Sequence, residues 1–132
     1  MANQRTRGHN FERRIMKRFK DLGYHSCLTT RNGSRFLDNC KLDLMNIPYR
    51  VQCKYGAHRG LSYSKLIEDM EKLTKKTEYA DLPIVIFHTK DGRRKSTKLV
   101  VMPEDHYFDI ISELKTLKEK QNRELSSSVP ED

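Results

Sequence analysis

The sequence has no apolar run approaching the roughly 20 residues that a membrane-spanning helix needs. Its first residues, Met1-Ala2-Asn3-Gln4-Arg5, also lack the apolar segment of a signal peptide. The cysteines, Cys27, Cys40 and Cys53, are odd in number and form no CxxC pair, which argues against a disulfide framework or a zinc site. We therefore expect reduced thiols in a cytoplasmic protein.

Several catalytic motifs are also missing. The sequence contains no GxxxxGK[ST] loop and no GxSxG elbow, so neither nucleotide hydrolysis nor acyl transfer is indicated. The histidines show no HExxH or other metal-ligand spacing, and we interpret them as surface or packing residues, with His9 and His58 as candidate phosphate contacts: His9, His25, His58, His88 and His106.

Positive charge is what the sequence has in excess. The 132 residues, enough for one domain, include 26 Lys and Arg against 18 Asp and Glu, which gives a net charge of +8. A balance this basic favours a polyanionic partner, nucleic acid first. The alternative is a soluble protein that is basic without binding a polyanion.

Hydrophobic periodicity and turn residues predict elements in the order α-β-β-β-α-β-β-α. We expect an α/β sandwich in which helices flank a central mixed β-sheet. The predicted helices cover 10–22, 62–78 and 103–121, the strands 24–30, 82–88 and 98–102, the hairpin 41–54, and the turns 31–34 and 91–92. We further expect a flexible basic arm over 1–9, one domain over 10–122 and a disordered tail over 123–132.

Three polar side chains meet in the predicted hairpin. If it is symmetric about the bond between residues 47 and 48, Asp43 lies opposite Gln52, and Gln52 and Lys54 share one face. Directly opposed residues have Cβ atoms ~4.5–5.5 Å apart. A carboxylate, an amide oxygen and an ammonium group in one patch suit a hard divalent cation beside a phosphodiester. Without Asp43 opposite it, Lys54 is simply an exposed strand lysine.

A second carboxylate lies within an apolar stripe. Glu12 precedes Ile15 and Met16 by three and four residues, so it shares their face of the first helix. Burying an unpaired carboxylate is unfavourable by several kcal/mol as an order of magnitude, so Glu12 needs a partner. A metal ion or a lysine from the hairpin would serve. A structural ion pair, or a side chain that reaches solvent, is the alternative.

These residues belong to a series of motifs: Gly8-His9-Asn10-Phe11-Glu12-Arg13-Arg14, Leu22-Gly23-Tyr24, Arg31-Asn32-Gly33-Ser34, Leu42-Asp43-Leu44 and Val51-Gln52-Cys53-Lys54. In this order they resemble the PD-(D/E)xK nucleases, and most of all the compact archaeal and phage Holliday-junction resolvases. The motifs cover residues 8–54, and the rest of the chain matches only in the arrangement of its predicted elements. The resemblance implies a restriction-endonuclease-like fold.

The resemblance also implies roles for the motif residues. Glu12 and Asp43 would bind Mg²⁺ or Mn²⁺, and the Gln52 amide oxygen and the Cys53 carbonyl complete the oxygen donors that such ions prefer. Lys54 would orient the attacking water or stabilise developing charge. Ser34 matches a serine, and Arg31 a basic residue, near the active site of the archaeal resolvases.

Two positions depart from the family pattern. Leu42 stands where the family name has proline, which is a mild deviation, and Gln52 replaces a carboxylate. Some branches, including the Mrr-type restriction nucleases, use Gln-x-Lys. The chain is therefore such a variant, an inactive relative that binds DNA, or a protein with an engineered Glu-to-Gln change.

The prediction is a Mg²⁺-dependent endonuclease that nicks branched DNA, acting in the host cytoplasm if a phage encodes it. Another structure-specific or Mrr-like restriction-type nuclease, or a catalytically inactive DNA-binding relative, is the alternative. The expected DNA-contacting residues are Arg13, Arg14, Lys17, Arg31, Arg35 and Arg59. Coordinated nicking of a junction implies a homodimer, with Tyr107, Phe108, Ile111 and Leu114 as candidate interface residues, although core packing explains them equally well.

Overall fold

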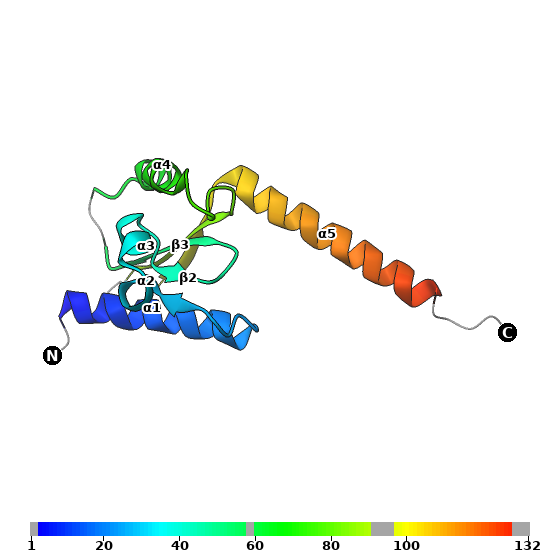
Figure 1. The fold of residues 1–132 in the computed structure, drawn as a ribbon, viewed down its shortest axis with the longest axis horizontal. Coiled ribbons are helices and arrows are strands. Elements are labelled where there is room, and N and C mark those ends of the chain that lie inside the picture. Colours follow the sequence, from blue (N-terminus) through cyan, green and yellow to red (C-terminus); the bar gives the residue numbers. More distant parts are fainter. Residues whose placement is uncertain (1–2, 58–59, 91–96, 128–132) are drawn as a thin grey trace. The chain divides into compact units, whose positions relative to one another are not determined.

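The structure is a computed structural model that describes residues 3–57, 60–90 and 97–127 (Figure 1). The chain divides into two compact units, Met1–Met102 and Pro103–Asp132. The sequence predicted one domain over 10–122, so the boundary after Met102 differs from that expectation. The candidate site lies entirely within the first unit.

The central sheet has three strands in the order β3-β4-β5. Strands β3 (Arg50–Tyr55) and β4 (Ile84–Lys90) run parallel, whereas β4 and β5 (Thr97–Val101) run antiparallel. A separate antiparallel pair joins β1 (Leu28–Thr29) to β2 (Leu44–Met45). The chain is thus mixed α/β, with a mixed sheet flanked by helices, as predicted.

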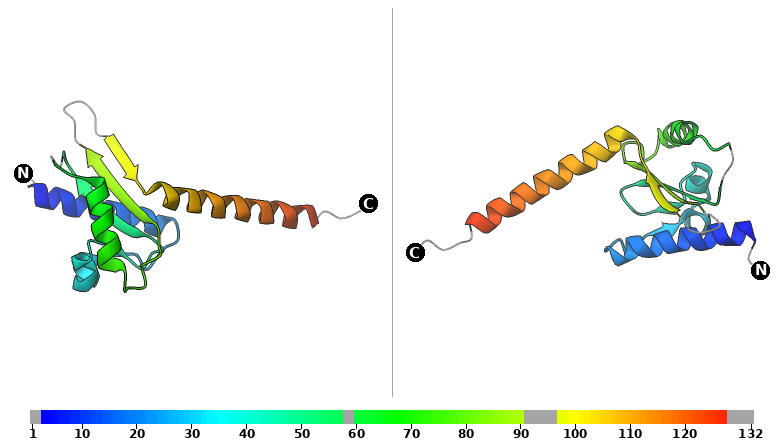
Figure 2. Two further views of the ribbon diagram at one scale, coloured as in Figure 1. Left: turned by 90° about the horizontal axis from the view of Figure 1, so that it is seen from above. Right: turned by 180° about the vertical axis from the view of Figure 1, so that it is seen from behind.

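Helices α1 (Gln4–Asp21) and α4 (Tyr63–Thr74) cover opposite faces of the sheet (Figures 1 and 2). Successive side chains of a strand point to opposite faces, so the alternation in β3 and β4 supplies two cores. The α1 side buries Phe11, Ile15, Phe19, Val51 and Val85. The α4 side buries Leu66, Met70, Ile84 and Ile86.

Helix α1 begins earlier than the sequence predicted. Asn3 is its N-cap and accepts a 2.8 Å hydrogen bond from the Thr6 amide, so residues 4–9, expected in a flexible arm, are helical. The helix ends at Asp21, with Leu22 as its C-cap, and Gly23 follows with a φ of 109°. The side chain of Leu22 is 76% exposed.

The segment between α1 and β2 is more helical than expected. The predicted strand over 24–30 is reduced to β1, and the predicted turn over 31–34 forms the short helix α2 (Thr30–Gly33). Helix α3 (Arg35–Asn39), which the sequence did not predict, follows directly. Its N-cap is Ser34, whose Oγ accepts a 3.2 Å hydrogen bond from the Leu37 amide.

The predicted hairpin over 41–54 is wrong as a paired ladder. Its first half pairs with β1 and its second half with β4. The two halves still meet, since the Asp43 amide donates a 2.8 Å hydrogen bond to the Val51 carbonyl. The turn between them includes Asn46 with a φ of 64°.

The second unit contains helix α5 (Glu104–Ser127). Residues 123–127, expected in a disordered tail, belong to this helix, since its amphipathic pattern continues to Leu125. Among the described residues, no helix combines the length and the apolar character needed to cross a bilayer. The predicted turn over 91–92 lies outside the described residues, as do His58 and Arg59.

Candidate active site

Asp43 is held between two backbone segments. Its amide donates to the Val51 carbonyl at 2.8 Å, and its carbonyl accepts a 3.0 Å hydrogen bond from the Thr30 amide. Its Oδ2 accepts a 2.7 Å hydrogen bond from the Cys53 amide. In an antiparallel arrangement the bond between the Asp43 amide and the Val51 carbonyl places Asp43 opposite Val51, one residue away from the predicted partner Gln52, and the Asp43 carboxyl group reaches the Cys53 amide.

The carboxyl group of Asp43 lies in an environment that disfavours its charge. Burial raises its pKa to about 7, and the nearby carboxylates of Glu12 and Asp38 act in the same direction. The Cys53 amide and the Lys54 ammonium group lower the pKa, but they do not offset the burial. The side chains of Asp43, Glu12, Asp38 and Lys54 therefore interact electrostatically, and the carboxyl group of Asp43 titrates near neutral pH.

Glu12 has a partner of the opposite sign. Its side chain is only 16% exposed, and its Oε2 forms an ion pair with Nη2 of Arg31. Arg31 also acts on His9, which lies one helical turn before Glu12. Burial, and then the positive charge of Arg31, lower the pKa of that histidine. The partner that Glu12 needs in the absence of a metal is thus an arginine of α2.

Gln52 is buried, and its amide group has a structural task. Its Nε2 donates a hydrogen bond to the carbonyl of Lys41, a residue with a φ of 67°. A carboxylate cannot donate, so a glutamate at this position would place an acceptor oxygen against an acceptor carbonyl. The local structure therefore suits glutamine better than glutamate when no cation is bound.

The oxygen atoms offered by the predicted metal ligands are of the type that a hard divalent cation prefers. Glu12 and Asp43 offer carboxylate oxygens, and the Gln52 amide and the Cys53 carbonyl offer neutral ones, which is the oxygen chemistry that Mg²⁺ takes. Over residues 3–57, 60–90 and 97–127, no group of three His, Cys, Asp or Glu side chains is placed to hold a metal. Water and a phosphate oxygen would have to complete the coordination.

The other predicted site residues divide into two groups. Ser34 caps α3, and the thiol of Cys53 has a pKa raised well above its usual value by burial and by Asp43, so it is no nucleophile. Arg13 donates a 2.9 Å hydrogen bond to Oδ1 of Asn10 on the surface of α1. Lys17 and Arg35 are exposed, and Arg59 lies outside the described residues.

Asp38 and His9 are neighbours of the site that the sequence indicated only as minor candidates, Asp38 as an acid behind the metal ligands or, preferably, a solvated turn residue, and His9 as a phosphate contact. Asp38 is exposed, its Oδ1 lies 3.4 Å from Oγ1 of Thr30, and its charge reaches Asp43. The available signal was the position of His9 three residues before Glu12 on one helix face. Nothing local in the sequence places Asp38.

No protein-family model, no curated protein and no solved structure matches the chain. The resemblance to the PD-(D/E)xK nucleases therefore rests on the motif residues of the sequence alone.

Proposed function

We propose that the protein is a metal-dependent DNA endonuclease of the PD-(D/E)xK type, with a restriction-endonuclease-like fold, that nicks branched DNA as a Holliday-junction resolvase does. The observation that carries the proposal is the gathering of Glu12, Asp38 and Lys54 around the carboxyl group of Asp43, whose pKa is about 7. Strongly shifted pKa values with specific charged neighbours are typical of functional sites. The preference for junctions comes from the family resemblance.

The group that the proposal requires is Mg²⁺ or Mn²⁺, held by Glu12, Asp43, the Gln52 amide oxygen and the Cys53 carbonyl. Such an ion polarises a phosphoryl oxygen and lowers the pKa of its water. The Glu12 and Asp38 carboxylates act on Asp43 at the place where a cation would lie, and this grouping of acidic side chains supports the assignment. The ion pair between Arg31 and Glu12 would have to loosen for Glu12 to become a ligand.

The other roles in the proposed reaction, holding the water and the phosphates, would fall to side chains that carry positive charge. Lys54 would hold the attacking water or the scissile phosphate, because its ammonium group lies close enough to Asp43 to lower the pKa of that carboxyl group. Arg31, released from Glu12, would be free to contact a phosphate oxygen. The exposed bases Arg13 and Lys17 on α1 supply charge for the DNA backbone, which sets affinity rather than sequence preference.

The test is a cleavage assay with Mg²⁺ or Mn²⁺ on a synthetic four-way junction, a linear duplex and a single strand. Symmetric nicks in the junction alone support the proposal. Cutting of all substrates supports the alternative, a structure-specific or Mrr-like restriction-type nuclease. Tight, salt-sensitive binding with no product in either metal supports a catalytically inactive DNA-binding relative. The hydrogen bond from Gln52 to Lys41 favours glutamine as the native residue over an engineered change.

Junction resolution needs two nicks, and we infer that α5 joins two copies of the chain. Exposed apolar side chains recur along it at helical spacing: Tyr107, Ile111, Leu114, Leu117 and Leu125. Residues 104–113 carry four acidic and no basic side chains, whereas residues 115–124 carry four basic and two acidic ones. Antiparallel pairing of two α5 helices would place each acidic half beside a basic half.

Sedimentation velocity tests the α5 dimer. The wild type should sediment as a dimer, and the double variant Ile111→Asp/Leu114→Asp should sediment as a monomer, because the carboxylates would lie in the apolar stripe. The control Thr116→Ala alters an exposed, uncharged residue on the opposite face of the helix and should remain dimeric. A monomeric wild type, or a double variant that stays dimeric, would rule out this interface.

A further inference from the structure

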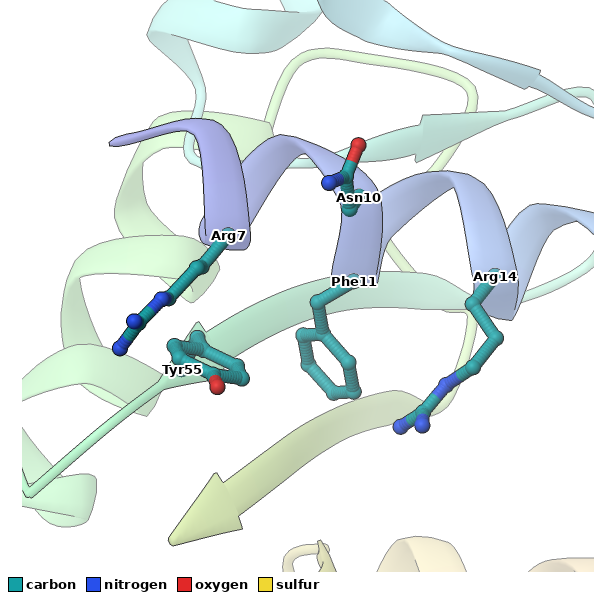
Figure 3. Close-up of a pocket in the computed structure, with 5 residues that line it drawn as sticks. All are labelled: Arg7, Asn10, Phe11, Arg14 and Tyr55. Carbon is teal, nitrogen blue, oxygen red and sulfur yellow. The ribbon is translucent and has the colours of Figure 1, made fainter. Parts of the chain in front are cut away.

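A pocket outside the carboxylate cluster lies between α1 and the end of β3 (Figure 3). Helix α1 supplies Arg7, Asn10, Phe11 and Arg14, whose spacing puts them on one helix face, and β3 supplies Tyr55. In Figure 3 the two arginines lie on either side of the two aromatic rings. The pocket therefore joins positive charge to an aromatic surface.

The arrangement is already held in place by contacts within the protein. The Arg14 guanidinium lies 5.1 Å from the centroid of the Phe11 ring and donates a 3.4 Å hydrogen bond to Oγ1 of Thr89. The rings of Phe11 and Tyr55 lie 6.2 Å apart between centroids. A ligand would therefore meet an ordered platform, with little side-chain entropy left to lose on binding.

The pocket is next to the candidate active site along both elements that form it. Tyr55 directly follows Lys54, and Phe11 directly precedes Glu12, so the Cα atoms of each pair are about 3.8 Å apart. Neighbouring side chains of a strand point to opposite faces, so Lys54 and Tyr55 flank the two sides of one strand end. A DNA strand at Lys54 would therefore reach the pocket by passing the end of β3.

We propose that this pocket binds an unpaired nucleotide of the DNA strand next to the scissile phosphate, with its base against Tyr55 and its phosphate between Arg7 and Arg14. The inference rests on the proposed function, because it takes DNA as the ligand of the neighbouring site. Planar guanidinium groups match phosphate oxygens in a bidentate manner, and aromatic rings stack on any base that is free of its own stack. Paired bases of a duplex cannot offer that face, whereas a branch point or a bulge can.

The test uses DNA that carries 2-aminopurine, a base whose fluorescence falls on stacking. The probe is placed at the unpaired position of a bulged duplex and, as a reference, in the fully paired duplex. We expect the wild type to quench the bulge and not the paired probe, in EDTA, so that no cleavage occurs. Tyr55→Phe should quench as the wild type does, whereas Tyr55→Leu should not.

Equilibrium binding gives the second readout. Loss of one base–aromatic stack should weaken binding of the bulged DNA by roughly 5-fold to 150-fold in Tyr55→Leu and leave the paired duplex unaffected. Arg7→Gln should lower the slope of log K against log salt by about 0.7–0.9, the value of one phosphate contact. The exposed control Lys76→Gln, in the turn that follows α4, should change neither quantity.

Each result either supports or overturns the proposal that this pocket binds a nucleotide, and cleavage is measured in a separate assay. Cleavage without quenching overturns the pocket and leaves the endonuclease in place. Quenching that depends on Tyr55, in a protein that cuts no DNA in Mg²⁺ or Mn²⁺, supports the pocket and overturns the proposed function. Equal quenching of paired and unpaired probes, failure to bind DNA, or a Tyr55→Leu variant that is folded and quenches normally overturns the pocket.

Discussion

Arg50 and Asp43 are two charged groups buried around the same strand, β3, and their surroundings differ. Arg50 is 2% exposed, and its guanidinium is fully engaged. Nε donates to the Leu82 carbonyl at 2.7 Å, Nη1 to Glu71 and Thr74 at 3.0 and 3.1 Å, and Nη2 to the other oxygen of Glu71 at 3.2 Å. Glu71 balances the charge of Arg50, and all three guanidinium nitrogens donate hydrogen bonds.

Asp43 has no such balance. Its nearest donor is the Cys53 amide, and two further carboxylates lie near enough to oppose its ionisation. A buried charge that is balanced stabilises one structure, whereas a cluster with surplus negative charge is incomplete until a cation or a proton arrives. The comparison assigns Arg50 to the architecture and Asp43 to the chemistry.

The largest expected effect is on cleavage. Asp43→Asn keeps the shape of the side chain but removes the charge that would hold the metal, so cleavage should fall by about 10³-fold while DNA binding stays within a factor of about three. Glu12→Ala should behave similarly. The measurement is single-turnover cleavage at saturating protein.

A matched control is Asp81→Asn, which removes an exposed carboxylate ahead of β4 and should cleave as the wild type does. If Asp43→Asn loses DNA binding and folding together with activity, Asp43 is structural like Arg50, and the comparison fails.

The next effect is on stability. Arg50→Met should lower the free energy of unfolding by about 3 kcal/mol, because the carbonyl of Leu82 and the hydroxyl of Thr74 lose a buried donor and Glu71 loses its partner. Urea denaturation measures it, and the exposed control Arg35→Met should change stability by less than about 0.5 kcal/mol. The cleavage rate per folded molecule of Arg50→Met should equal that of the wild type. A loss of cleavage in a fully folded Arg50→Met protein would contradict the division of roles.

The pKa of Asp43 predicts how stability depends on pH. Because the folded value is about 7 and the ordinary value is 3.8, the native state binds more protons than the unfolded state between these limits. Stability contributed by this group is therefore present at low pH and lost as pH rises through about 7. Between pH 5 and pH 8 in EDTA, the free energy of unfolding of the wild type should therefore fall by about 2–3 kcal/mol relative to that of Asp43→Asn. Parallel stability curves for the two proteins would show that the carboxyl group is not strained.

The smallest effect concerns the missing carboxylate. Gln52→Glu should lower the metal-free stability by about 1–2 kcal/mol, because the Lys41 carbonyl loses its donor. Added Mg²⁺ should restore that stability, and cleavage should be kept or raised, since the extra charge strengthens metal binding. Thermal unfolding with and without Mg²⁺ is the measurement, with Gln121→Glu on α5 as the exposed control. A collapse of cleavage would show that the amide itself is needed.

Elements whose signal is local could be predicted from the sequence. The spacing of Phe11, Ile15 and Phe19 predicted α1, and the apolar run over 82–88 predicted β4. Their ends were less predictable, because the cap at Asn3 depends on one side-chain hydrogen bond. The helix that α3 forms after Ser34 was missed because Asn32-Gly33-Ser34 reads as a turn.

Strand partners could not be predicted, since pairing is decided by contacts far apart in sequence. Nothing in residues 41–54 shows that β2 prefers β1 and that β3 prefers β4. The predicted register, with Asp43 opposite Gln52, is off by one residue, because the conformation of the turn, with Asn46 at a φ of 64°, is not evident from the sequence. The pairing of Glu12 with Arg31, and the burial of Arg50 against Glu71, depend on how whole elements pack.

Counting bound Mn²⁺ tests the central claim most directly. Electron paramagnetic resonance would compare the wild type, Asp43→Asn and Arg50→Met, each saturated with a phosphorothioate four-way junction that resists cleavage. We expect the wild type and Arg50→Met to bind one more Mn²⁺ ion per chain than Asp43→Asn. Equal Mn²⁺ binding by all three proteins would contradict the assignment of Asp43 to a metal site.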